Sequence, residues 1–204
     1  MYKVFFNDHT IYLMDGMPDF KGSEKAYVCT FQQKDDLESQ LRNYLTPEMN
    51  ADLYIYSPVV KDIFGVFRSC FWKIPAAGGL VRNQKNEYLI IFRRGKWDLP
   101  KGKAEKKETS EETALREVQE EVNLDGITLE KFLTSTYHIY YLDGKAVLKQ
   151  TDWYLMAYSG TKEPAPATKE DIEQTVWMTP SEVKGITGNI FPSIIEVFRT
   201  VIRN

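Results

Sequence analysis

The chain has few of the residues that build disulfide frameworks, zinc sites or membrane spans. Its 204 residues include two cysteines and two histidines, too few and too scattered for a cross-linked scaffold or a Cys/His metal cluster. No apolar run is long enough to span a bilayer, and no signal peptide is recognisable. We therefore expect reduced thiols at Cys29 and Cys70 in a cytoplasmic protein that does not bind a membrane.

A surplus of positive charge is also missing. The formal net charge of −3 provides no basic footprint for nucleic acid, so no nucleic-acid partner is expected. A hydrophobic share of 43% supports a real core, and the length suits one large or two small domains. We expect two: a small α+β domain over residues 1–68 and an α/β domain over residues 69–204.

The first 68 residues indicate alternating strands and helices without a catalytic constellation. Strands are expected at 3–6, 10–13, 26–31 and 52–56, and a helix with apolar residues from Leu37 to Leu45 should end before Pro47. Ser57 followed by Pro58 predicts the start of a second helix. Substrate capping, partner binding and dimerisation all stay open as roles for this domain, and a homodimer is compatible with it.

The most informative stretch runs from a Pro- and Gly-bearing loop at residue 97 into a helix. Thr109 or Ser110 is expected to cap this helix, and no helix breaker follows before Asn123. Residues three and four apart share a helix face, so three carboxylates would project into one small volume, those of Glu117, Glu120 and Glu121. Solvent, interleaved Lys or Arg side chains, or hard divalent cations would relieve their repulsion.

The charges before the helix have the opposite sign. Residues 93–107 contain seven basic and two acidic residues, whereas residues 108–121 contain six glutamates and one arginine. This contrast suits a small phosphorylated substrate whose oxygens are shared between basic side chains and carboxylate-held Mg²⁺. The alternative is that both segments are ordinary solvated surface.

The spacing of these residues resembles the Nudix hydrolase signature, Gly-x5-Glu-x7-Arg-Glu-U-x-Glu-Glu-x-Gly-U, where U is aliphatic. Eight of its nine specified positions match: Gly102, Glu108, Arg116, Glu117, Val118, Glu120, Glu121 and Leu124. Asn123 stands where the family usually has Gly, at a helix end that needs a left-handed backbone, which Asn tolerates. Residues 97–102 also resemble the loop of relatives that act on dinucleoside or inositol polyphosphates, and the resemblance spans about residues 70–203.

The resemblance implies a fold and an activity. The fold would be an α/β/α sandwich with a mixed sheet, and the order of the remaining elements fits it: strands at 71–81, 87–93, 132–142, 146–158 and 175–178, a turn or short helix at 179–183 and a helix at 193–202. Asp143-Gly144 predicts a tight hairpin turn between two of these strands. The activity would be hydrolysis of a phosphoanhydride, in a nucleoside diphosphate linked to another moiety, by water attacking phosphorus.

Roles for individual residues follow from the same resemblance. Mg²⁺, with Mn²⁺ as an alternative, would be held by the Gly102 carbonyl and the carboxylates of Glu117, Glu120 and Glu121. Glu108 and Arg116 would form a structural ion pair, and substrate phosphate would meet three basic residues: Arg93, Lys101 and Lys103. The general base would be Glu120, Glu121 or the downstream Glu173; otherwise Glu170, Asp171 and Glu173 form an acidic loop.

Three functional hypotheses are compatible with the sequence. The first is the Mg²⁺-dependent pyrophosphohydrolase. The second is a sensor that binds a nucleotide such as an ADP-ribose compound without cleaving it, although such a protein would be expected to lack helix carboxylates that this chain keeps. The third is a prenyl diphosphate isomerase, which would need a cysteine in the pocket, whereas Cys29 and Cys70 both precede the motif.

Overall fold

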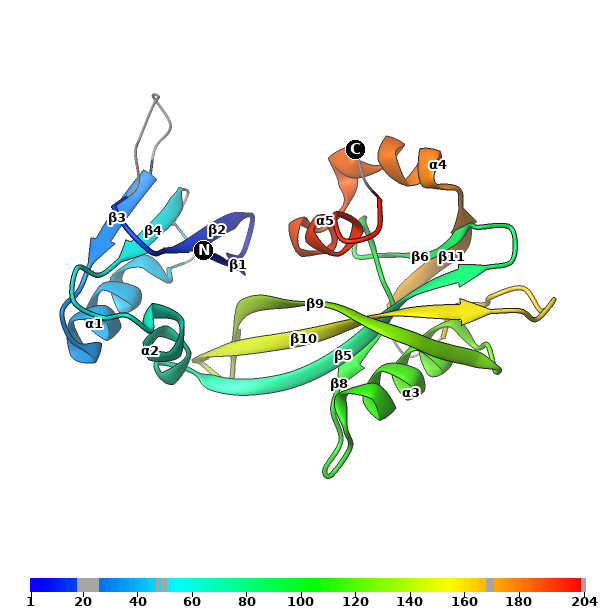
Figure 1. Cartoon of the computed structure of the whole chain (residues 1–204), viewed down its shortest axis with the longest axis horizontal. Coiled ribbons are helices and arrows are strands. Elements are labelled where there is room, and N and C mark those ends of the chain that lie inside the picture. The colour runs from blue at the N-terminus through cyan, green and yellow to red at the C-terminus, as the bar shows by residue number, and fades with distance from the viewer. Residues whose placement is uncertain (18–25, 47, 49–50, 168–170, 203–204) are drawn as a thin grey trace. The chain divides into compact units, whose positions relative to one another are not determined.

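The computed structural model describes residues 1–17, 26–46, 48, 51–167 and 171–202, so Pro47 and Glu170 lie outside the described residues. The chain forms two compact units (Figure 1). The first comprises Met1–Lys73 and Tyr137–Lys149, and the second comprises Ile74–Thr136 and Gln150–Asn204. The expected domain boundary between residues 68 and 69 stays a prediction.

The first unit combines a small sheet with two helices. Its elements are β1 (Tyr2–Phe6), β2 (His9–Met14), β3 (Ala26–Thr30), α1 (Lys34–Tyr44), β4 (Asp52–Tyr56) and α2 (Ile63–Ser69). The strands follow the order β9-β1-β2-β4-β3, in which β1 and β2 are antiparallel and the other three pairs are parallel. The four expected strands and the first helix are therefore confirmed.

One expected helix start in this unit is wrong. The chain does not enter a helix at Ser57; α2 begins at Ile63, where the Asp62 carboxylate accepts the first-turn amide of Gly65 at 2.8 Å. The Ser57 hydroxyl instead donates to the Phe31 carbonyl at 2.8 Å and accepts from nearby backbone amides. Ser57 is buried and thus caps a turn that is tied to the end of β3 rather than a helix.

The second unit is built on a sheet of five main strands with helices on both faces. Its elements are β5 (Trp72–Asn83), β6 (Tyr88–Arg93), β7 (Lys96–Asp98), β8 (Lys101–Lys103), α3 (Ser110–Val122), β9 (Ile127–Leu142), β10 (Lys145–Tyr158), β11 (Ile172–Met178), α4 (Pro180–Gly185), the 3₁₀ turn η1 (Thr187–Asn189) and α5 (Pro192–Phe198). The strand order is β11-β6-β5-β10-β9, with β7 paired to β6 and β8 to β5.

Two apolar cores separate the layers of this unit. On one face Val118 and its helix neighbours in α3 pack on Ala77 and Met156 of the sheet. On the other face Ile194 and the rest of α5 pack on Leu80 of β5. Figure 1 shows α3 and α5 on opposite sides of the strands. The predicted α/β/α sandwich is thus confirmed, because each sheet face buries one amphipathic helix layer.

The β9–β10 hairpin turns where the sequence predicts. Asp143 and Gly144 have φ values of 49° and 74°, the two positive values that a two-residue primed turn needs. Within the residues that the structure describes, no helix is long and apolar enough to cross a membrane.

Candidate active site

Helix α3 begins and ends as the sequence predicts. The Thr109 hydroxyl accepts the Glu112 amide at 3.2 Å, and the Glu112 carboxylate accepts the Thr109 amide at 2.8 Å, which forms a capping box. At the other end Asn123 is left-handed, with φ of 52°. The two caps set the ends of the helix, and its apolar residues pack on the sheet, which leaves Glu117 and Glu120 at the margin of the core.

Gly102 brings the backbone of β8 directly against α3. It pairs with Ala77 of β5, and a Cβ atom on Gly102 would lie 1.8 Å from the Glu117 Oε2 atom. Since no side chain fits in that space, a residue other than glycine would push the Glu117 carboxylate or the strand away. The structure therefore places the Gly102 backbone and a carboxylate of α3 side by side.

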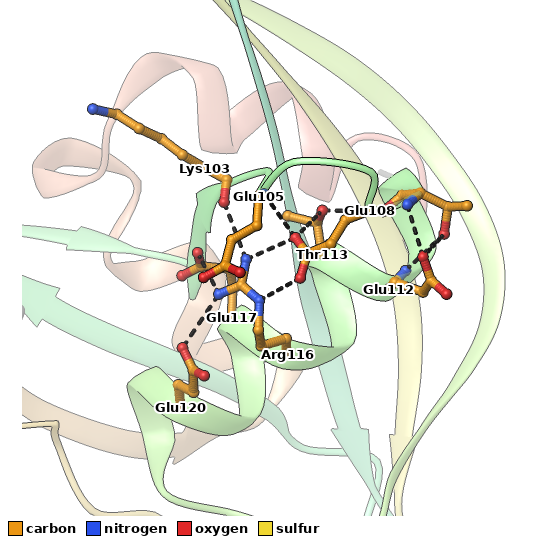
Figure 2. Close-up of polar contacts among 9 residues, drawn as sticks. Lys103, Glu105, Glu108, Glu112, Thr113, Arg116, Glu117 and Glu120 are labelled. Atoms are coloured by element: carbon orange, nitrogen blue, oxygen red, sulfur yellow. Dashed lines mark hydrogen bonds and ion pairs between the residues drawn. The ribbon is translucent and has the colours of Figure 1, made fainter.

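Glu108 and Arg116 form the pair that the motif predicts (Figure 2). Arg116 donates from Nε and Nη2 to the two Glu108 oxygens, at 2.6 and 2.9 Å, and from Nη2 to the Lys103 carbonyl at 3.1 Å. The hydrogen bond from Arg116, then that from the Glu105 amide, lowers the pKa of Glu108 to about 2. This bidentate contact ties the loop after β8 to the helix.

The same guanidinium lies between two of the predicted metal ligands. Arg116 Nη1 donates to Glu117 Oε1 at 2.9 Å and to Glu120 Oε2 at 3.3 Å, as Figure 2 shows. Interleaved arginine was one of the ways in which the carboxylate repulsion could be relieved. Within the described ranges, no three Asp, Glu, His or Cys side chains are gathered closely enough to hold a metal ion.

Glu121 differs from its neighbours because it is buried. Glu121 is 1% exposed, and its Oε2 atom accepts a hydrogen bond from the Lys101 amide at 2.9 Å. Burial raises the pKa of Glu121 to about 7, against the opposing effects of Lys101 and Arg93. A carboxyl group of this kind changes its protonation state near neutral pH.

Asp98, which is not part of the signature, organises the loop before Gly102. It is 2% exposed and accepts from Arg93 Nε at 2.8 Å, from Lys101 Nζ at 2.7 Å and from the Leu99 amide at 2.8 Å. Burial alone would raise its pKa, but the two cations and these hydrogen bonds outweigh burial, so the pKa lies below its usual value. In the sequence, this role of Asp98 is indicated by an acidic residue inside an otherwise basic loop.

A cavity of about 1280 Å³ runs along the exposed face of α3. Its lining residues are Lys106, Lys107, Glu108, Glu112, Leu115, Arg116, Glu117, Gln119, Glu120, Glu121, Asn123, Asp125, Pro166 and Ala167. The structure thus brings five predicted site residues together, namely Glu108, Arg116, Glu117, Glu120 and Glu121. It does not place Arg93, Lys101, Gly102, Lys103 or Glu173 in this lining.

The basic residues predicted to bind phosphate and the downstream base candidate have other surroundings. Arg93 and Lys101 both point to Asp98. The Lys103 side chain extends away from the Arg116 cluster (Figure 2). Glu173 is exposed on β11, next to Ile172, which lies opposite Arg93 in the register. Their roles in substrate binding or catalysis stay predictions.

Comparison with known proteins agrees with this geometry. A family model described as the NUDIX domain matches residues 72–197. The chain belongs to the Nudix family. Nudix proteins are pyrophosphohydrolases that act on acid anhydrides of small phosphorylated substrates, typically with a divalent metal.

One curated relative is similar to half of the chain. The putative mutator protein MutT4 of Mycobacterium tuberculosis (strain CDC 1551 / Oshkosh) is 36% identical over 116 residues, which cover 50% of this chain and 45% of that protein. The chain thus spans about half the length of this curated relative.

Two solved structures match part of the chain at lower identity. A MutT protein from Methanosarcina mazei Go1 has a TM-score of 0.50 at 20% identity and covers 63% of this chain and 92% of its own. A C. elegans Ap4A hydrolase binary complex has a TM-score of 0.48 at 19% identity and covers 62% and 93%.

Proposed function

We propose that this Nudix chain is a Mg²⁺-dependent pyrophosphohydrolase. It would cleave a phosphoanhydride in a nucleoside diphosphate linked to another moiety, by attack of water at phosphorus. The observation that carries the proposal is the contact of the Gly102 backbone with the Glu117 carboxylate, because a Cβ atom on Gly102 would lie 1.8 Å from that oxygen. The Gly102 backbone and the Glu117 carboxylate, which come from two elements, thus lie next to each other, as the metal ligands of the resemblance would.

The chemistry of the proposed donors suits a hard divalent cation, although their carboxylates are not gathered around one point in this structure. These donors are the Gly102 carbonyl and the carboxylates of Glu117, Glu120 and Glu121, all of them oxygen ligands, which Mg²⁺ and Mn²⁺ prefer. When bound, such ions would neutralise charge on phosphate oxygens and make water a better nucleophile. Glu117 and Glu120 both accept from Arg116, and the Glu120 side chain is 63% exposed, so it can reorient toward a cation.

Other residues position the loop and the metal ligands or would activate the attacking water. Glu108 and Arg116 brace the loop on α3, and the Lys101 amide fixes the orientation of Glu121. Glu120 is the first choice for the general base because its side chain is 63% exposed and can approach a water molecule. Glu121 and Glu173 are the alternatives.

The size of the cavity and the resemblance of one loop support the proposed substrate class. The cavity of about 1280 Å³ exceeds the roughly 300–1,000 Å³ of ordinary small-molecule pockets, so it suits an extended ligand. The resemblance of residues 97–102 favours a dinucleoside polyphosphate or a diphosphoinositol.

Product release from a substrate panel tests the proposal. The panel contains diadenosine polyphosphates, ADP-ribose, nucleotide sugars, nucleoside triphosphates and diphosphoinositols, each with Mg²⁺ or Mn²⁺. We expect metal-dependent turnover of one class, a loss of at least about a hundredfold in Glu120→Gln, and wild-type activity in Glu111→Gln. Glu111 lies on the exposed first turn of the same helix and does not line the cavity.

Other outcomes have distinct meanings. Tight binding of one compound without turnover would replace the hydrolase with a nucleotide sensor. Equal losses in Glu120→Gln and Glu111→Gln would show that the effect reflects helix charge rather than chemistry. If turnover survives in Glu120→Gln but is lost in Glu173→Gln, the base is on β11.

A further inference from the structure

Three cations around the site are bound by carboxylates. Arg93 and Lys101 are bound by the buried Asp98, and Arg116 is bound by Glu108 and its neighbours. Because their charges are already matched by carboxylates, these three cations stabilise the fold and offer little uncompensated charge to a ligand. A substrate phosphate therefore needs other partners.

Lys106 and Lys107 are the cavity-lining cations without such a partner. Both are exposed, and neither forms an ion pair with a described residue, although Glu112 and Asp125 line the same cavity. Two adjacent ammonium groups that stay unmatched in a cavity rich in carboxylates leave their hydrogen-bond donors available to an anionic ligand.

The backbone under this pair is an independent observation. The Glu108 amide donates to the Glu105 carbonyl at 3.2 Å, so residues 105–108 form a tight turn, and Lys107 has φ of 78°. At the third position of such a turn a positive φ favours glycine. Left-handed geometry is disfavoured for residues with a Cβ atom, and such conformations concentrate at functional sites. Since the Lys107 side chain makes no ion pair within the described fold, the fold itself does not explain why lysine stands there.

We propose that Lys106 and Lys107 form a subsite for the phosphate groups of a polyphosphate chain beyond the linkage that is cleaved. This inference rests on the proposed function of the α3 carboxylates. Lys106 and Lys107 line the same cavity as Glu117 and Glu120. A phosphate chain that is held at these carboxylates can therefore extend along the cavity to the two lysines. The pair selects substrates with three or more linked phosphate groups over diphosphates.

Binding of analogues that cannot be hydrolysed tests the subsite without requiring turnover. The probes are methylenediphosphonate and its three-phosphorus homologue, titrated calorimetrically in Mg²⁺ buffer at low and high salt. The test variant is Lys106→Gln with Lys107→Asn, because Asn tolerates the left-handed backbone. The charge-keeping variant replaces both residues with Arg. The matched control is Lys131→Gln with Lys184→Gln, which removes two exposed lysines outside the cavity lining.

The wild-type chain should bind the longer probe about tenfold more tightly than the shorter one, and high salt should weaken this preference because both ammonium groups are exposed. The preference should vanish in the neutral variant and survive in the Arg variant and the control. No preference in the wild type, or an unchanged preference in the neutral variant, would overturn the subsite. Failure of the proposed hydrolase would instead appear as absent turnover in the substrate panel, whatever these probes show.

Discussion

Two buried carboxyl groups in the site have pKa values that move in opposite directions. Asp98 faces two cations, so its pKa lies below the usual value. Glu121 is buried with the Lys101 amide as its hydrogen-bond partner, and its pKa rises to about 7. The difference follows from the number of close opposite charges, since both groups are almost fully buried.

Removing the Asp98 charge should destabilise the protein strongly. Asp98→Asn leaves Arg93 and Lys101 beside each other in a buried site without their shared anion, and we expect a loss of about 3 kcal/mol or more in the free energy of unfolding. Denaturant titration at pH 7 measures the loss. The control is Asp171→Asn, which breaks a surface pair with Arg94 whose side chains are both 69% exposed, and which should cost less than about 1 kcal/mol. Similar losses in both variants would contradict a special role for Asp98.

Glu121 should give the metal-free protein an unusual pH dependence. Its folded pKa of about 7 lies above the value of about 4.3 for an unfolded chain, so between these pH values the folded state binds a proton that the unfolded state has released. The free energy of unfolding should therefore fall by roughly 3 kcal/mol as pH rises from 4.5 to 7.5. Denaturant titrations in chelator should show this fall in the wild type and not in Glu121→Gln. A fall of equal size in both proteins would assign it to another group.

At the residue scale, motif spacing predicted contacts but not burial. The Glu108–Arg116 pair could be predicted because its spacing belongs to the family signature. Asp98 could not, because its importance depends on Arg93 and Lys101 both turning onto one buried carboxylate, and the spacing of charges does not show which neighbouring cations do so. For the same reason Arg93 and Lys101 were expected to face substrate.

At the scale of elements, α3 is positioned by its ends and by glycine. The capping box starts the helix, the left-handed Asn123 ends it, and Gly79 allows it to pack closely, since a Cβ there would lie 2.5 Å from the Met156 sulfur and 3.1 Å from Val118. The two caps depend only on residues at the helix ends, so the helix bounds were predicted correctly from sequence.

The C-cap explains why Asn123 can replace the glycine that the family usually has. We expect Asn123→Gly to stay within about 0.5 kcal/mol of the wild type, because glycine also tolerates positive φ. Asn123→Ala should cost about 1 kcal/mol, because alanine does not. Thermal unfolding compares these variants with Gln119→Ala, a control at an ordinary helical position that should change little. Equal behaviour of the Ala and Gly variants would argue against the left-handed cap.

Other elements differ in how far their own residues determine their structure. The Asp143-Gly144 turn was predicted because its two residues determine its backbone. The helix start expected at Ser57 was wrong because the hydroxyl finds a tertiary partner, the Phe31 carbonyl. The short strands β7 and β8 were not expected, since each is three residues long and exists through pairing with β6 and β5.

At the scale of the whole molecule, the first unit is not continuous in sequence. Its core includes Ile139 and Leu148, both 1% exposed or less, which come from the end of the β9–β10 hairpin. Strand β1 pairs in parallel with β9 across Val4 and Tyr137. A chain divided between residues 68 and 69 would therefore separate this hairpin end from the strand that covers it, which composition and periodicity could not reveal.

Truncation tests whether the second unit can stand alone. A chain of residues 69–204 should aggregate, because loss of the N-terminal strands exposes Ile139 and Leu148 and leaves an unpaired strand edge on β9. Replacing residues 137–150 with Asn-Gly in the same truncated chain should restore a monomer, because a two-residue turn can join the facing ends of the hairpin at Thr136 and Thr151. Size-exclusion chromatography and thermal unfolding compare the two chains. A monomeric 69–204 chain would show that the hairpin end does not need the first unit, whereas aggregation of both chains would place the dependence elsewhere in the second unit.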